Sequence, residues 1–342
     1  MRWGLLGGSD IAATRMIPAM RALGQPITAV ASNSAGRAEA FAGAHAIATA
    51  TSGVDELLSR DDVDAVYIST TNQLHGPHTL AAAAAGKHVL CEKPVAMDLP
   101  EAWSMVAACD RAGVVFGVNH HLPSHTTHTE IRRLVAAGAI GEPKAVRVFF
   151  AFELAPRLRG WRLTDPVLGG PILDLLPHVG SVVNKLIGRP LVTTATAVRQ
   201  GSWDLPVPDT GATTLPEDAC MAVIRYEGDV LCQVDVGWSV PFARNGLEVH
   251  GTEGSLVARN VMRADPGGTL ELIDSAGERE VVMARHQDAY EVTLETFARS
   301  VSGDGAPAIS GLEGLRALAV ALAVRESSLR GRAVTLNLDP VG

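Results

Sequence analysis

The first 120 residues alternate short apolar runs with longer segments of helical periodicity, and this alternation constrains the fold more than any other feature. The runs predicted as strands are 3–6, 27–31, 65–69, 87–91 and 114–118. The segments predicted as helices are 11–22, 35–42, 55–58, 76–85 and 99–112. Strands separated by helices form parallel sheets, because a parallel connection has to cross over the sheet. The pattern predicts an α/β fold that begins with a doubly wound (Rossmann) dinucleotide-binding domain over residues 1–120.

Beyond residue 120 the pattern changes to clustered strands with fewer helices. Predicted helices are 130–137, 171–186, 290–301 and 311–328. Predicted strands are 145–153, 191–200, 219–226, 230–238, 246–250, 254–258, 270–273 and 280–283. The turns at 227–229 and 251–254 join neighbouring strands as hairpins do. We expect residues 121–342 to form an α+β domain with a large, mostly antiparallel open sheet and helices on one face.

Composition excludes several classes of protein. A chain of 342 residues is expected to split into two domains. Its net charge of −8 argues against nucleic acid or anionic membranes as partners. The four cysteines are widely scattered, which suggests reduced thiols rather than a disulfide framework or a metal site. No apolar run reaches the roughly 20 residues that span a bilayer, and the first run ends at a glycine, so we expect no secretory signal and a cytoplasmic location.

A small-residue turn between the first strand and the first helix is a candidate phosphate-binding site. It consists of Gly7, Gly8, Ser9, Asp10 and Ile11. Against the G-x-G-x-x-G pattern only the first glycine is kept, and serine and alanine occupy the other two positions. Small residues there let backbone N–H groups approach a pyrophosphate at a helix N-terminus. A plain tight turn is the alternative.

The end of the second predicted strand indicates which dinucleotide would bind. Chains that bind NAD tend to place an acid there, but this chain has Ser32 and Asn33, followed by Arg37. Hydroxyl and guanidinium groups bind a 2′-phosphate, which a carboxylate would repel. The sequence therefore favours NADP(H). The alternative is that Arg37 is only a solvated helix residue.

A charged pair and a proline follow the fourth predicted strand, as Glu92, Lys93 and Pro94. Open α/β sheets bind their ligands at the carboxyl ends of the strands. A lysine delivered to that edge can polarise a carbonyl or hold a hydroxyl. A solvated turn is the alternative interpretation.

Over nearly its whole length, the chain resembles the glucose–fructose oxidoreductase/inositol dehydrogenase (Gfo/Idh/MocA) family. The segments that carry the resemblance are 71–75, 92–94, 160–163 and 169–174, together with residue 178. Two departures from the family pattern are the lack of a proline after Thr71 and Pro171 in place of a third glycine. Within the family, the runs 2–5, 69–72, 119–122 and 250–256 resemble those of an NADPH-dependent sugar reductase.

The resemblance implies a full set of cofactor contacts. Gly8, Ser9, Asp10 and Ile11 would cradle the pyrophosphate, and Ser32, Asn33 and Arg37 the 2′-phosphate. The nicotinamide and its ribose would be lined by Thr70, Thr71, Asn72, His75, Glu92, Lys93 and Asn119. From the second domain, Trp161 and Arg162 would cover the nicotinamide and the substrate. Tyr290 would close the pocket, with a core tyrosine as the alternative.

Asp174 and His178 are four residues apart, so on a helix they share one face. A carboxylate beside an imidazole fixes its tautomer and raises its proton affinity. Together with Lys93, they would supply a cation that polarises the carbonyl, a proton donor and a carboxylate that orients this donor. Reduction of a carbonyl by hydride requires these groups. We assign His178 as general acid and Lys93 as polariser of the carbonyl oxygen, and these two roles could be exchanged. Asp174 would be the partner of His178 and would accept from a substrate hydroxyl. An ordinary surface pair is the alternative.

Four histidines lie within nine residues, at 120, 121, 125 and 128, and helical spacing could bring three of them together as zinc ligands. No thiolate or carboxylate joins them at a fitting interval, and Pro123 interrupts the spacing. We therefore expect no metal, and we expect His121 to face the sugar.

The expected function is NADPH-dependent reduction of a sugar-type carbonyl by hydride transfer. Alternatives are a polyol or inositol dehydrogenase, a glycoside hydrolase that retains NAD, and a non-catalytic dinucleotide sensor. The expected partner is a small sugar or polyol, without nucleic acid or membrane. The chain would act as a monomer or as a homo-oligomer formed through the sheet of the second domain.

Overall fold

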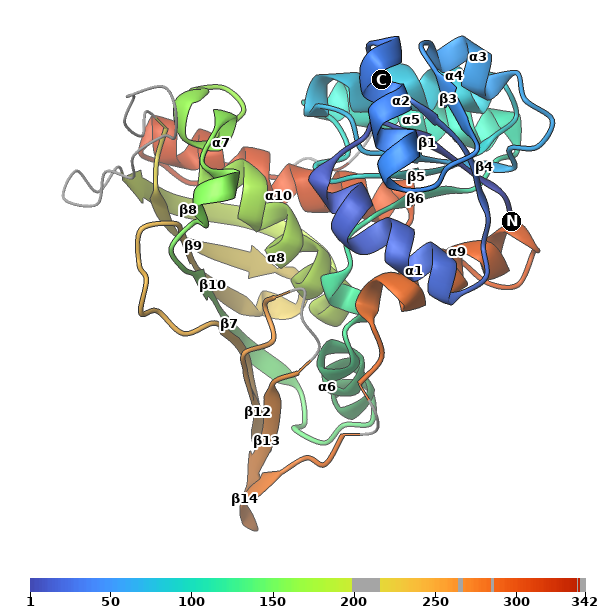
Figure 1. The fold of residues 1–342 in the computed structure, drawn as a ribbon. Helices are drawn as coiled ribbons and strands as arrows, with labels where there is room; N and C mark the ends of the chain where they lie inside the picture. Colours follow the sequence, from blue (N-terminus) through green and yellow to red (C-terminus); the bar gives the residue numbers. More distant parts are fainter. Residues whose placement is uncertain (199–215, 264–266, 284–285, 337, 339–342) are drawn as a thin grey trace. The chain divides into compact units, whose positions relative to one another are not determined.

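The structure is a computed structural model that describes residues 1–198, 216–263, 267–283, 286–336 and 338. The described residues form two compact units. The first unit contains Met1–Ser124 and Asp288–Leu315, and the second contains the described residues of 125–287 and of 316–338. Each unit has a sheet of its own (Figure 1).

The sheet of the first unit has six strands, all parallel to their neighbours. They are β1 Trp3–Leu6, β2 Ile27–Ala31, β3 Thr49–Thr51, β4 Ala65–Ile68, β5 His88–Cys91 and β6 Phe116–Val118. Their order is β3-β2-β1-β4-β5-β6, so the direction of winding reverses between β1 and β4. Every residue of β1 and β4 is buried, as expected for strands covered on both faces. The predicted doubly wound fold is confirmed.

Helices cover both faces of this sheet (Figure 1). They are α1 Ile17–Ala22, α2 Ala35–Ala44, α3 Val54–Leu58, α4 His75–Ala84 and α5 Leu99–Ala112. Helix α5 shows how the sequence sets these bounds. The Asp98 carboxylate accepts a hydrogen bond from the Glu101 N–H at 2.8 Å, and Gly113 ends the helix with a φ of 67°.

Helix α9, Ala289–Val301, belongs to the first unit although it is distant from it in the sequence. Its Phe297 ring lies 5.5 Å from the Trp3 ring in β1. A Cβ on Gly117 in β6 would come within 3.0 Å of the same ring, so a glycine lets the helix approach the sheet. The division at residue 120 that the sequence pattern suggests does not include this returning segment.

Three local predictions differ from the structure. Strand β3 was missed, because three residues are too few to show a period. The predicted helix 11–22 contains a π-helical turn, Ala12–Met16, before α1. The predicted strand 280–283 is wrong. The strand found here, β14, is Gly277–Glu280, because the turn at 275–276 pairs it with residues 271–274 of the preceding strand. The final two residues of the predicted strand 191–200 lie outside the described residues.

The sheet of the second unit has nine strands in the described part of the chain. They are β7 Pro143–Ala151, β8 Pro190–Val198, β9 Ala219–Tyr226, β10 Leu231–Gly237, β11 Gly246–Gly251, β12 Gly254–Arg259, β13 Thr269–Asp274, β14 and β15 Val334–Thr335. Their order is β14-β13-β12-β11-β7-β10-β9-β8-β15. All neighbours are antiparallel except β7 and β10, which are parallel. The mostly antiparallel sheet and the predicted hairpins at 227–229 and 251–254 are confirmed.

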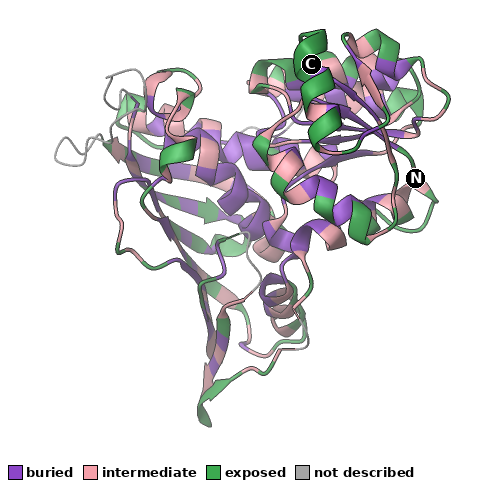
Figure 2. Ribbon diagram, viewed as in Figure 1, coloured by how far each residue is buried: buried purple, intermediate pink, exposed green. Residues whose placement is uncertain are grey.

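The inner face of this sheet is covered by α8, Pro171–Ile187, which contacts β7, β9 and β10 (Figure 1). Other helices of the unit are α6 Thr126–Ala136 and α7 Trp161–Thr164, and α10 runs over Gly311–Arg330. The part of α8 from Pro171 to Val183 is buried except for Asp174, which is partly exposed (Figure 2). The outer face of the sheet exposes apolar side chains, among them Met221, Val223 and Leu231 at 48–63%. Assembly through this face stays a prediction.

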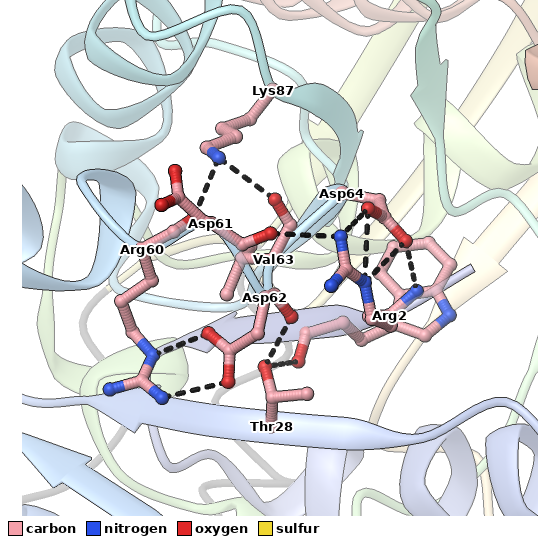
Figure 3. A network of polar contacts seen from close by, with 9 residues as sticks. Arg2, Thr28, Arg60, Asp61, Asp62, Val63, Asp64 and Lys87 are labelled. Atoms are coloured by element: carbon pink, nitrogen blue, oxygen red, sulfur yellow. Dashed lines mark hydrogen bonds and ion pairs between the residues drawn. The ribbon is translucent and has the colours of Figure 1, made fainter.

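A polar network holds the amino ends of β1, β4 and β5 together (Figure 3). The Arg2 guanidinium donates to Asp64 Oδ1 at 2.6 Å, and the Lys87 ammonium donates to the carbonyls of Arg60 and Val63 at 2.8 Å each. Because the strands are parallel, their carboxyl ends all lie at the opposite edge of the sheet. That edge, which this network does not occupy, is where open α/β sheets bind ligands. In the described part of the chain, no helix is long and apolar enough to cross a membrane.

Candidate active site

The carboxyl edge of the first sheet gathers most of the predicted site residues. Parallel strands end at one edge, so the loops after β1, β2, β4, β5 and β6 lie next to one another. These loops carry Gly7, Gly8, Ser9, Asp10, Ile11, Ser32, Asn33, Thr70, Thr71, Asn72, Glu92, Lys93, Asn119 and His121. Arg37 and His75 lie in the first turns of the helices that follow two of these loops.

The glycine turn after β1 leaves no room for side chains. Gly7 has a φ of 106°, and a Cβ there would lie 2.9 Å from the Ser69 carbonyl oxygen. A Cβ on Gly8 would lie 2.8 Å from the Phe41 ring. Ser9 Oγ accepts from the Ala12 N–H at 3.1 Å and is 2.8 Å from Ser69 Oγ. This bare backbone before a helix fits a dinucleotide pyrophosphate.

The loop after β2 presents polar groups without a carboxylate. Ser32 directly follows Ala31, whose carbonyl accepts the Gly7 N–H at 2.9 Å, so the two loops are adjacent. Ser34 caps α2, and Arg37 is exposed in its first turn. Its guanidinium has no ion-pair partner among the residues that the structure describes.

His75 joins the loop after β4 to the loop after β5. Its Nδ1 lies 2.8 Å from the Pro94 carbonyl oxygen and its Nε2 lies 3.2 Å from the Thr70 carbonyl oxygen. Burial lowers the pKa of His75 to about 4, so the ring is neutral near pH 7 and has one N–H to donate. The two contacts therefore help to hold the loop that carries Lys93 in place.

Glu92 is held by two buried donors. Its Oε1 accepts from Tyr67 Oη and from Asn119 Nδ2, both at 2.6 Å. Burial raises the pKa of Glu92 above its ordinary value, and the two hydrogen bonds and the charge of Lys93 only partly oppose that rise. Burial also raises the pKa of Tyr67 well above its ordinary value, so its hydroxyl keeps the proton that it donates. Sequence analysis missed Tyr67; its signal was a hydroxyl within an otherwise aliphatic strand.

Tyr290 of α9 stacks on His121, with ring centroids 4.6 Å apart. It is only 2% exposed, which places it in the core of the first unit, whereas His121 is partly exposed. The return of α9 to this unit brings the two rings together. Their pairing had no signal in the sequence, since nearly 170 residues separate them.

In the second unit, two glycines bring α7 onto the start of α8. The N–H groups of Gly169 and Gly170 donate to the carbonyls of Asp165 and Arg162 at 2.9 and 3.0 Å. A Cβ on Gly169 would lie 2.5 Å from the Arg162 oxygen. Arg162 Nε then pairs with Asp174 Oδ2 at 3.3 Å. The guanidinium carbon also lies 4.6 Å from the centroid of the Trp161 ring, which is 40% exposed.

His178 lies one turn beyond Asp174 on α8, so the two residues share a face of the helix. The His178 side chain is buried, and its ring meets the Phe150 ring edge-on at a centroid distance of 6.3 Å. The structure thus places the predicted residues of the second unit, Trp161, Arg162, Asp174 and His178, on two consecutive helices.

The alternative of a zinc site requires three or more His, Cys, Asp or Glu side chains placed to hold a metal ion. The described residues contain no such group. His128 Nε2 is 2.8 Å from the Val261 carbonyl oxygen, and burial lowers the pKa of His128 to about 3. His125 caps α6, and its ring centroid lies 5.8 Å from that of His128. The roles found for these two rings are structural.

Comparison with known proteins agrees with this architecture. The family model described as "Oxidoreductase family, NAD-binding Rossmann fold" matches residues 1–120, and the "GFO/IDH/MocA C-terminal domain" matches residues 128–257. The chain belongs to the Gfo/Idh/MocA oxidoreductase family. One relative in the family, the 1,5-anhydro-D-fructose reductase of Ensifer adhaerens, is 41% identical over 338 residues, 98% of each chain. The D-xylose 1-dehydrogenase (NADP(+)) 2 of Haloferax volcanii is 29% identical over 98% of this chain and 100% of its own.

Solved structures of the same fold include a levoglucosan dehydrogenase in complex with NADH and L-sorbose. Its TM-score is 0.87, with 21% identity and 99% of each chain covered. The aldose–aldose oxidoreductase of Caulobacter crescentus, in complex with glycerol, has a TM-score of 0.85 and 23% identity over 98% of this chain and 99% of its own. At these identities the likeness shows the Gfo/Idh/MocA fold alone.

Proposed function

We propose that the protein is an NADPH-dependent reductase of a sugar-type ketone or aldehyde, with 1,5-anhydro-D-fructose as the first substrate to test. The observation that carries the proposal is the edge of the first sheet, where Lys93 lies on the same side as the glycine turn. A dinucleotide whose pyrophosphate meets Gly7 and Gly8 would run along this edge. The 41% identical relative is named for reduction of that sugar, which supports the substrate class.

The choice of NADP(H) rests on the loop after β2. Ser32 ends the strand next to the glycine turn, and the exposed Arg37 guanidinium lies in the following helical turn. Hydroxyl and guanidinium groups bind a 2′-phosphate, and the strand end carries no carboxylate to repel one. NADH in one solved relative does not decide the matter, because that structure shares only 21% identity.

In the proposed reaction, a bound NADPH would provide the hydride that the carbonyl carbon accepts, becoming NADP⁺, and the carbonyl oxygen would take a proton. The Lys93 ammonium polarises the oxygen and stabilises its developing negative charge. His178 donates the proton, since a protonated imidazole is a good acid near neutral pH. Asp174, held by Arg162, orients the substrate hydroxyls and the imidazole.

A substrate panel tests this proposal against its alternatives. The purified protein is mixed with NADPH or NADH and with 1,5-anhydro-D-fructose, aldoses or inosose, and the loss of reduced nicotinamide is followed by absorbance. Parallel assays contain NADP⁺ with polyols, or an aryl glycoside with catalytic NAD⁺. The proposal expects consumption of NADPH with a sugar-type carbonyl. Consumption of NADP⁺ with polyols alone would indicate a dehydrogenase. Release of the alcohol from an aryl glycoside without net cofactor change would indicate the hydrolase, and tight binding without turnover a sensor.

A further inference from the structure

The outer face of the second sheet contains a cavity of about 400 Å³. Successive side chains of a strand point to opposite faces of its sheet. In β7, Val148 and Phe150 are buried on the face that α8 covers, and the Phe150 ring meets the His178 ring. Phe149, between them, points to the other face and lines the cavity. The sheet therefore lies between the cavity and His178.

The register of the strands explains why a cavity forms there. Across the outer face, Gly246 of β11 is paired with Phe149 of β7 on one side and with Arg259 of β12 on the other. A glycine has no side chain, so this row of the sheet has a gap at Gly246. Two residues further along the strands, Glu248 and Val257 are paired and also line the cavity. Side chains of three neighbouring strands thus surround the gap.

Two arginines line this cavity, Arg244 and Arg259. The Asn260 N–H donates to the Asn245 carbonyl at 2.9 Å, which holds the two chain segments side by side. Since Arg259 is opposite Gly246, Arg244 is its diagonal neighbour, at a spacing that long side chains reach. Neither guanidinium has a hydrogen-bond or ion-pair partner among the residues that the structure describes. Two like charges at this spacing repel each other, and an anion bound between them would remove the repulsion.

The carboxylate in the cavity wall has partners of its own. Glu248 Oε2 lies 3.5 Å from Arg147 Nη1 and 3.2 Å from His250 Nε2. Arg147 offsets the charge of Glu248, so this carboxylate does not cancel the charge of Arg244 and Arg259. A carboxylate also accepts hydrogen bonds from hydroxyl groups. Glu248 is therefore placed to bind the hydroxyls of a ligand whose anionic group meets the arginines.

These features point to a phosphate ester of a hydroxylated molecule. A phosphate monoester carries a charge of about −1.5 to −2 near pH 7, which matches two guanidiniums, whereas a carboxylate matches only one. Sites for small molecules typically measure about 300–1,000 Å³, so this cavity has room for more than an inorganic phosphate. The C–H groups of a sugar or polyol can pack against the Phe149 ring.

We propose that this cavity is a second ligand site, which binds a sugar or polyol phosphate. Arg244 and Arg259 hold the phosphate, Glu248 accepts from the hydroxyls, and Phe149 packs against the carbon skeleton. Because the whole chain has a net charge of −8, these two arginines and not the overall field of the protein would attract the anion. The site shares no residue with the loops of the first sheet or with α7 and α8, so it does not depend on the proposed function.

Isothermal titration calorimetry with glucose 6-phosphate tests the proposal, with inorganic phosphate as the reference ligand. The variants are Arg244→Gln and Arg259→Gln, which keep a long polar side chain but lose the charge. Arg225→Gln is the matched control, since Arg225 lies on the same face of the sheet, in β9, and pairs with Asp229 at 3.3 Å. All three arginines are exposed, so these variants should fold, which circular dichroism verifies.

We expect the parent to bind one glucose 6-phosphate at this site. Binding should be at least about tenfold weaker in Arg244→Gln and in Arg259→Gln, because each loses a charge-assisted hydrogen bond, and unchanged in Arg225→Gln. Phe149→Ala should reduce the affinity for glucose 6-phosphate toward that for inorganic phosphate. Equal affinities of the parent for the two ligands would contradict the assignment of a hydroxylated ligand.

Three other results would overturn the proposal. If the parent does not bind glucose 6-phosphate, or if Arg244→Gln and Arg259→Gln bind it as the parent does, the two arginines are only solvated surface residues. If binding is lost in Arg37→Ala instead, the phosphate occupies the loop after β2. If the parent sediments as a dimer and both arginine variants as monomers, a second copy of the chain covers the cavity.

Discussion

Arg162 and Asp174 form an ion pair, with Nε and Oδ2 3.3 Å apart, that joins α7 to the helix carrying His178. The pair is largely buried, with side-chain exposures of 24% and 13%. The carboxylate that the sequence pairs with His178 therefore also has a guanidinium partner, which the Gly169–Gly170 turn brings into place. Such a pair orients a carboxylate, because a guanidinium donates from a planar, rigid group.

The first prediction concerns the proton donor. His178→Asn keeps a hydrogen-bonding side chain but cannot transfer a proton, which typically costs about 100- to 10,000-fold in rate. Reduction by the parent should decline as pH rises and the donor loses its proton, and this alkaline limb should flatten in His178→Asn. His128→Asn, which changes a buried histidine bonded to the Val261 carbonyl, is the control and should keep the limb. A limb that persists in His178→Asn but vanishes in Lys93→Arg would make Lys93 the acid.

The second prediction is that Lys93→Ala lowers kcat by about 100-fold or more while NADPH still binds. The contact to the carbonyl oxygen strengthens as negative charge develops, so its loss appears in turnover. Lys87→Ala is the matched control at the other end of β5, where the ammonium bonds two backbone carbonyls. It should lower thermal stability but not kcat. Near-normal turnover in Lys93→Ala would show that Lys93 is only a turn residue without a role in the reaction.

The third prediction places the cofactor preference in the loop after β2. Arg37→Ala should weaken NADPH binding roughly 10- to 150-fold, the loss of about 1.5–3 kcal/mol in a charge-assisted contact, and should barely change NADH binding. Ser32→Asp should shift the preference further toward NADH by repulsion of the 2′-phosphate. The control is Arg111→Ala, another exposed arginine, at the end of α5 near the amino edge of the sheet. Fluorescence titrations with both cofactors measure the effect; equal losses for NADPH and NADH would contradict the assignment.

The fourth prediction concerns acid stability. Hydrogen bonding to Arg2 lowers the pKa of Asp64 to about 2 from an ordinary value of 3.8. A carboxyl whose pKa is lower in the folded state stabilises the fold above its unfolded pKa. That contribution fades as pH falls from about 4 to about 2, and solvent screening of this partly exposed pair keeps it below about 1 kcal/mol.

Urea unfolding of Asp64→Asn at pH 6 and pH 3 measures this contribution. The variant should be less stable than the parent at pH 6, and the difference should shrink at pH 3. Asp61→Asn is the control, because Arg2 contacts Asp61 through its backbone carbonyl and not its carboxylate. A difference that is the same at both pH values would show that the Asp64 charge contributes nothing.

The sequence by itself determined the architecture of the first unit and the positions of its loops. The bounds 3–6, 27–31 and 99–112 are those of β1, β2 and α5. Apolar periodicity and capping residues are local properties, so a stretch of four to fourteen residues carries them. Once the strands are known to be parallel, every loop after a strand falls on one edge, and this places Gly7, Ser32 and Lys93 together without any coordinates.

Only the tertiary structure decided which distant segments meet. The return of α9 to the first unit, the parallel pairing of β7 with β10, and the contact of Tyr67 with Glu92 all join residues whose spacing in the chain has no period. Strand β3, three residues long, is defined by its neighbour β2 rather than by its own composition. The physical reason is that pairing and side-chain contact depend on burial and on hydrogen-bond partners supplied by other elements, whereas the pattern along the chain reports only how one element repeats.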